Sequence, residues 1–146
     1  MGSSFVEFHG DGFWVRDGSL EIWLSVLVEQ IDRESTPPEW LRDLREQWHV
    51  ATIGFNGCVP TELDEHITTE ERKAVALHLS EQALRQLRAY GPTIGVDELN
   101  RLSVAHVGSY WTQDLPITFF TDVGDYFILL LRGDLPPVSE PINVLP

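Results

Sequence analysis

The first residues of the chain alternate apolar and polar positions in two short runs. Residues 5–8 and 13–15 are rich in aromatic and β-branched residues, which favour strands. Gly10, Asp11 and Gly12 lie between the two runs and are typical turn residues. The pattern therefore predicts an N-terminal β-hairpin.

The next stretch has the spacing of a helix. Apolar residues recur at three- and four-residue steps from Leu20 to Ile31, and Asp17 or Ser19 is the expected N-cap. Ile22 and Val26 are apolar too, although they lie off that stripe. A helix that is apolar around most of its circumference is expected at the centre of the core.

Two later segments begin with the sequence of a capping box. Residues 36–39 predict a second helix with proline at its first position, which continues to about Trp48. Residues 68–71 predict a third, which continues to about Tyr90, where a Gly-Pro pair ends it. A short helix is expected over residues 96–102.

The last third of the chain allows two interpretations. Residues 117–120 are β-rich and predict a strand, whereas residues 126–131 form an apolar run too short for periodicity to decide. A helix is favoured for that run because Asp122 is a good cap and Gly133 a good stop. Gly124 counts against the helix, since glycine lowers helix propensity.

These elements predict an α+β fold. We expect a mainly helical single domain with three main helices, an N-terminal β-hairpin and, if residues 117–120 form a strand, a second small β element. The globular domain is expected over residues 1–135. Residues 136–146 contain four prolines and predict an extended tail.

Composition narrows the class of protein. The chain has 146 residues, and its 42% hydrophobic and 23% charged residues are typical of a globular domain. Its 23 acidic and 10 basic residues give a net charge of −13, which disfavours nucleic acid and anionic membranes as partners. The start of the chain does not resemble a signal peptide, and Cys58 is the only cysteine, so a cytoplasmic location is expected.

Few residues suggest reaction chemistry. Cys58, in a glycine-rich loop, is the best nucleophile candidate, but no local pattern supplies the base that it would need. Glu62, Asp64, Glu65 and His66 are the densest group of metal-ligating types, yet neighbours in sequence rarely converge on one ion. Acids before a helix also interact favourably with its dipole. The common nucleotide, hydrolase, zinc and dithiol motifs do not occur, and we expect no cofactor and no metal.

Aromatic residues beside polar segments are the remaining candidates. Tryptophan and tyrosine are favoured at positions where one part of the side chain packs on apolar groups and the other faces water, as at protein interfaces. The set expected to bind a partner is Trp40, Trp48, Phe55, Tyr110 and Trp111, with the carboxylates Asp64 and Glu65.

We therefore expect a non-catalytic acidic binding protein. In size and charge the chain is similar to the small immunity proteins that neutralise a basic toxin, although no motif carries this likeness. Such a protein would occupy a basic protein partner through charge-steered encounter and aromatic anchoring. Two alternatives stay open: a small enzyme that uses Cys58 or a site around residues 62–66, and an accessory or regulatory subunit.

Overall fold

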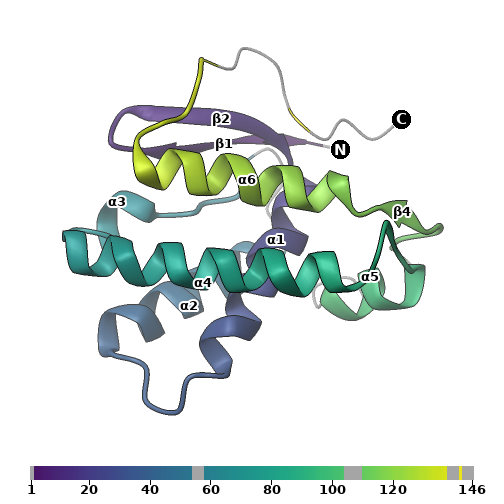
Figure 1. Cartoon of the computed structure of the whole chain (residues 1–146), viewed down its shortest axis with the longest axis horizontal. Coiled ribbons are helices and arrows are strands. Elements are labelled where there is room, and N and C mark those ends of the chain that lie inside the picture. The colour runs from purple at the N-terminus through teal and green to yellow at the C-terminus, as the bar shows by residue number, and fades with distance from the viewer. Residues whose placement is uncertain (1, 54–57, 104–109, 138–141, 143–146) are drawn as a thin grey trace.

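The fold combines a hairpin, a set of helices and a second, smaller sheet (Figure 1). The computed structural model describes residues 2–53, 58–103, 110–137 and 142. Within them the elements are β1 (Ser3–Phe8), β2 (Asp11–Arg16), α1 (Asp17–Asp32), α2 (Glu39–Ala51), α3 (Leu63–His66), α4 (Glu70–Ala89), β3 (Thr93–Ile94), α5 (Val96–Leu102), β4 (Leu115–Pro116) and α6 (Thr118–Arg132).

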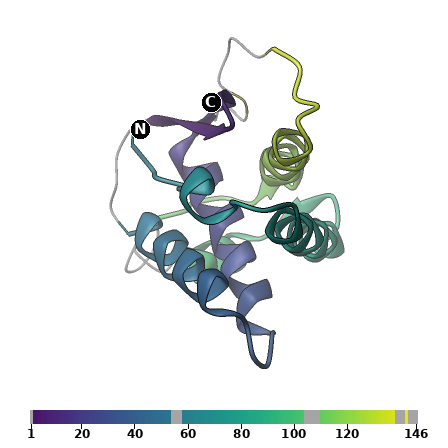
Figure 2. The ribbon, with the colours of Figure 1, turned by 90° about the vertical axis from the view of Figure 1, so that its left-hand side faces the viewer.

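Helix α1 is the centre of the molecule. It contacts α2, α4, α5, α6 and β2, and 14 of its 16 residues are buried. In Figure 2 it runs down from the hairpin between α2 on one side and the pair α4 and α6 on the other. This arrangement confirms the expectation that a helix apolar around most of its circumference lies at the centre of the core.

The three helices α1, α4 and α6 meet at Gly124. A Cβ atom on this glycine would come within 2.6 Å of Leu84 and 2.7 Å of the Trp23 ring. Trp23 also packs edge-on against Phe127, with ring centroids 5.7 Å apart. Gly124 therefore lowers the helix propensity of α6 locally but allows a close approach that no other residue would permit.

The hairpin is confirmed, with a turn one residue earlier than expected. His9 and Gly10 form the turn, with φ values of 51° and 84°, and Asp11 and Gly12 belong to β2. Positive φ at both central residues is the geometry of a type I′ turn, whose twist matches that of the strands. The buried face of the hairpin packs against α6, where Phe13 contacts Tyr126, and the residues of the opposite face are more exposed.

Three predicted helix starts need correction. Asp17 does not cap α1, because Arg16 is the cap residue; the Asp17 carboxylate accepts a hydrogen bond from the Ser4 hydroxyl (2.5 Å) instead. The capping box at residues 36–39 does not form, since α2 begins at Glu39 and Pro38 is its cap residue. The cap of α4 is Thr69, which accepts from the backbone N–H of Arg72.

The C-terminal third is more helical than predicted. The expected strand at residues 117–120 is wrong, because α6 begins at Thr118 and Asp122 lies inside it. Residues 126–131 are helical as favoured, and Gly133 ends the helix with a φ of 77°. The second small sheet is the pairing of Thr93–Ile94 with Leu115–Pro116, and α5 has the predicted bounds.

The end of the chain is described at few positions. Ile142 forms a parallel bridge with Val15, where its backbone N–H donates to the carbonyl of Trp14 (3.0 Å). The boundary of the globular domain at residue 135 stays a prediction. Among the helices that the structure describes, none combines the length and the apolar character needed to span a bilayer.

The close approach at Gly124 gives a test of the fold. We predict that Gly124→Ala lowers the free energy of unfolding by about 1–3 kcal/mol, because the added methyl group overpacks the contact with Trp23 and Leu84. Urea unfolding measures the change. Asp122→Ala, at an exposed position of the same helix, is the control and is expected to be neutral or stabilising. A Gly124→Ala protein as stable as the wild type would contradict the packing.

Candidate functional site

Two hollows on the surface differ in the charge of their walls. The larger, about 960 Å³, lies between α1, α4 and α5. Its walls contain equal numbers of acids and bases, namely Glu29, Asp32, Glu98, Arg33, Arg85 and Arg101. Its balance of charge makes it a poor attractor for a ligand of either sign.

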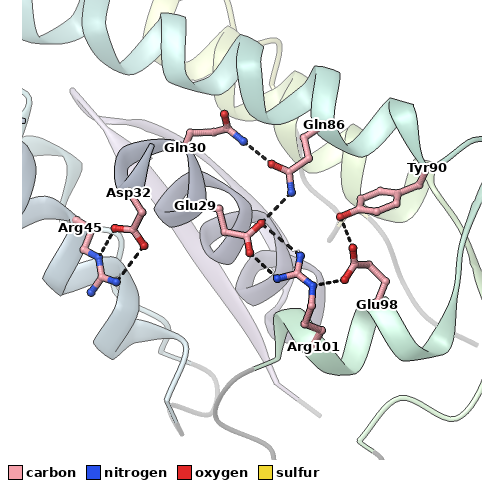
Figure 3. Close-up of polar contacts among 8 residues, drawn as sticks. All are labelled: Glu29, Gln30, Asp32, Arg45, Gln86, Tyr90, Glu98 and Arg101. Atoms are coloured by element: carbon pink, nitrogen blue, oxygen red, sulfur yellow. Dashed lines mark hydrogen bonds and ion pairs between the residues drawn. The ribbon is translucent and has the colours of Figure 1, made fainter. Parts of the chain in front are cut away.

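Several side chains of the larger hollow form hydrogen bonds and ion pairs with one another, as Figure 3 shows. Arg101 of α5 donates to both carboxylate oxygens of Glu29 on α1 (2.7 and 3.4 Å) and also binds Glu98. Gln86 of α4 donates to Glu29 (2.9 Å), and the Tyr90 hydroxyl donates to Glu98 (2.7 Å). The network thus ties α1, α4 and α5 together.

The pKa values in this network agree with a structural role. Burial by itself would raise the pKa of Glu29, but the hydrogen bonds from Arg101 and Gln86 outweigh burial and hold it below its usual value. The Arg101 hydrogen bond lowers the pKa of Glu98 more than burial raises it. Both carboxylates are therefore held ionised and paired. Arg45 of α2 binds Asp32 of α1 through two nitrogens in the same manner (Figure 3).

The smaller hollow has a different character. It has a volume of about 380 Å³ and lies between the exposed face of the hairpin and residues 58–65. Its charged residues are all acidic: Glu7, Glu62, Asp64 and Glu65. Among the described residues that line it there is no lysine, arginine or histidine.

Two exposed aromatic rings form the hairpin side of this hollow. Phe5 and Trp14 face each other across β1 and β2, with ring centroids 5.2 Å apart, and are 40% and 41% exposed. The Phe5 ring also lies over Gly12, where a Cβ atom would come within 2.5 Å of it. Because these contacts hold the rings in place, they offer a preformed apolar surface beside the carboxylates.

The opposite wall is fixed by bonds to the hairpin and the core. The backbone N–H of Val59 donates to the Ser4 hydroxyl (2.8 Å), and the Trp48 indole N–H donates to the carbonyl of Thr61 (2.9 Å). The Asp64 carboxylate accepts from the backbone N–H of His9 at the hairpin turn (3.0 Å). Glu62 precedes α3 in the left-handed conformation, with φ 48° and ψ 40°, which is strained for a residue other than glycine.

We call this site the acidic-aromatic hollow and define it by Phe5, Glu7, Trp14, Glu62, Asp64 and Glu65. Of the residues expected from sequence to bind a partner, it contains Asp64 and Glu65. Sequence reasoning missed Phe5 and Trp14. The signal was present, because strand alternation places Val6, Phe8, Phe13 and Val15 on the buried face and leaves Phe5 and Trp14 on the other.

The other expected aromatic residues lie elsewhere. Trp48 and Trp111 are buried, 1% and 6% exposed, and each donates its indole N–H inside the protein, so neither offers much surface to a partner. Trp40 is half-buried, with the guanidinium of Arg72 over its ring at 5.1 Å. Tyr110 is 37% exposed and packs on Trp111. Phe55 lies outside the described residues.

The structure also gives the positions of Cys58 and His66, the residues of the alternative enzyme hypothesis. Cys58 is exposed and lines the acidic-aromatic hollow. The His66 ring nitrogen Nδ1 contacts the backbone carbonyl of Glu62 (3.1 Å). In the described part of the chain, no three histidine, cysteine or acidic side chains are grouped so that they could hold a metal ion.

A separate pair of acids is buried near the start of α1. Asp17 and Glu21 lie one turn apart and are 3% and 8% exposed. Burial, with a contribution from the charge of Asp17, raises the pKa of Glu21 to about 7. Burial and the charges of the same two acids raise the pKa of Tyr110. The environment of Glu21 in the folded protein therefore favours its protonated form over its ionised form.

Glu21 makes stability depend on pH. Because its pKa is about 7 in the folded protein against an ordinary 4.5, the folded state binds the proton more tightly than the unfolded state does. The free energy of unfolding should therefore fall between pH 4.5 and 7, by up to about 3 kcal/mol from this group. Glu21→Gln is predicted to be more stable than wild type at pH 8 and equal to it at pH 4, by urea unfolding. Equal stability at both pH values would contradict the prediction.

The strain at Glu62 gives another test. Asparagine tolerates the left-handed conformation better than glutamate does, so we predict that Glu62→Asn raises the free energy of unfolding by about 0.5–1 kcal/mol. Glu65→Asn, inside α3, is the matched control and should be neutral or slightly destabilising. Thermal unfolding of the two variants measures the difference. If both variants behave alike, Glu62 is not strained.

Comparison with known proteins adds no functional information. Searches against protein-family models, curated proteins and solved structures found no match, so the functional argument rests on the chain's own geometry.

Proposed function

We propose that this protein is a non-catalytic acidic binding protein that occupies a basic protein partner, in the manner of an immunity-type inhibitor. The observation that supports it best is the acidic-aromatic hollow, in which four carboxylates and two exposed aromatic rings meet without a basic side chain among its described walls. Carboxylates provide charge complementarity to a basic protein, and exposed aromatic rings provide the anchors that dominate interface energies.

The distribution of ion pairs supports the same proposal. In the described part of the chain, five arginine or lysine side chains form ion pairs with seven carboxylates. These pairs use half of the ten basic residues but under a third of the 23 acidic ones. Other carboxylates, among them Glu34, Asp43 and Glu71, are exposed, and negative charge at the surface can accelerate the approach of a cationic partner.

Charge alone steers many proteins together, so specificity must come from contact. Hydrogen bonds from His9 to Asp64, from Val59 to Ser4 and from Trp48 to Thr61 hold the walls of the acidic-aromatic hollow in place before any partner arrives. A preformed site loses little conformational entropy on binding. The proposed sequence of events is fast, salt-sensitive encounter followed by aromatic packing, and it requires no chemical step. That the partner is met in the cytoplasm is part of the proposal.

The test uses the purified protein immobilised and exposed to an extract of its native source. A partner retained at low salt should be a basic protein, and its affinity, measured with the purified pair, should fall as salt rises. We predict that neutralising three acids of the hollow together (Glu7→Gln, Glu62→Gln and Glu65→Gln) weakens binding at least tenfold, chiefly through slower association.

A matched variant controls for net charge. Glu34→Gln, Asp43→Asn and Glu71→Gln remove the same three charges from exposed positions outside the hollow. This control should bind within about threefold of wild type, because distant exposed charges are screened at physiological salt. Equal losses in both triple variants would show that net charge, and not the hollow, determines binding. Absence of any salt-sensitive basic partner would overturn the proposed function.

A further inference from the structure

The acidic-aromatic hollow has features that select a particular side chain. It is small, about 380 Å³, near the lower end of the range of ligand pockets. One wall is an exposed indole ring, and the charged groups of the other wall are carboxylates. A ligand that fits both walls is cationic and presents a flat face to an aromatic ring.

Arginine satisfies these conditions better than lysine. Its planar guanidinium stacks on aromatic faces and donates several hydrogen bonds in the plane of the group, where carboxylates can accept them. Lysine carries a compact charge that stacks poorly and is more strongly hydrated. Tryptophan is the aromatic residue that attracts cations most strongly.

The protein already contains one such contact. The guanidinium of Arg72 lies over the ring of Trp40 at 5.1 Å, while its Nη1 donates to the carbonyl of His66 (2.9 Å). In the hollow, Trp14 is 41% exposed, and Phe5 packs beside it at an interplanar angle of 58°. Among the described residues that line the hollow, no cation covers the Trp14 ring.

We propose that the acidic-aromatic hollow binds an arginine side chain of the basic partner, with the guanidinium over the Trp14 ring and its N–H groups donating to the surrounding carboxylates. This inference rests on the proposed function and adds the chemical identity of the anchor. It makes Trp14 the principal contact and gives Phe5 the role of holding the indole in place. Asp64, which the His9 backbone N–H already engages, contributes less than Glu7, Glu62 and Glu65.

The test compares two short peptides that are identical except that one carries arginines where the other carries lysines. Titration of the full chain at physiological salt should show tighter binding of the arginine peptide, and NMR should show a shift of the Trp14 indole N–H. Trp14→Ala should weaken the arginine peptide about threefold to thirtyfold, in line with the usual strength of a cation–π contact. Trp14→Phe, which keeps a ring in place, should weaken it less.

Trp40→Ala is the matched control, because it removes a tryptophan that Arg72 already covers, outside the hollow. It should leave peptide affinity unchanged. Thermal unfolding of each variant establishes that it is folded. If Trp14→Ala does not fold, the affinity of Trp14→Phe and the NMR shift of the Trp14 indole N–H test the arginine site instead.

The outcomes separate the two proposals. Equal affinity for both peptides, or binding that is unchanged in the Trp14 variants, overturns the arginine site. If a salt-sensitive basic partner is nevertheless retained by the immobilised protein, the proposed function stands and the anchor lies elsewhere. If the wild type binds neither the peptides nor a basic protein, both proposals fail.

Discussion

The enclosure of α1 is the constraint on which the rest of the structure depends. A helix with 14 of its 16 residues buried must be covered on every side, and the hairpin, α2, α4, α5 and α6 do this together. The contact between Trp23 and Gly124 shows how tightly these elements pack around α1, since a methyl group added to Gly124 would clash with the Trp23 ring. Because these elements pack against α1 and against one another, charged groups and the outer face of the hairpin remain at the surface, and the candidate site is built from them.

Carboxylates have different surroundings in two polar regions of the molecule. Around Glu29 and Arg101, opposite charges pair across three helices, and each carboxylate is held ionised by its partners. The described residues that line the acidic-aromatic hollow include no lysine, arginine or histidine, and the His9 imidazole, outside this lining, comes within 3.9 Å of the Asp64 carboxylate. The first arrangement links three helices of the fold, whereas the second provides the negative charge that the proposed basic partner would meet.

Much of the fold follows from local sequence, and the errors have physical causes. The central helix, α4 and the hairpin were predictable because their hydrophobic periods are long or regular. The strand expected at residues 117–120 is helical because packing of α6 against α1 and α4 overrides the β propensity of its first residues. Asp64 and Glu65 were found by charge, whereas Phe5 and Trp14 required the strand alternation to be applied to the hairpin. Their approach to residues 58–65 is a long-range contact that no local pattern encodes.

The proposed role of the acidic-aromatic hollow is to receive a cationic side chain of the partner in a site that is already formed. The most direct measurement is a crystal structure of the protein grown with an arginine-containing peptide at physiological ionic strength. If the hollow has this role, density for one guanidinium is expected over the Trp14 ring, with Phe5 and residues 58–65 in the positions that they occupy in the free protein. A peptide bound at the larger, charge-balanced hollow between α1, α4 and α5, with Trp14 left bare, would contradict it.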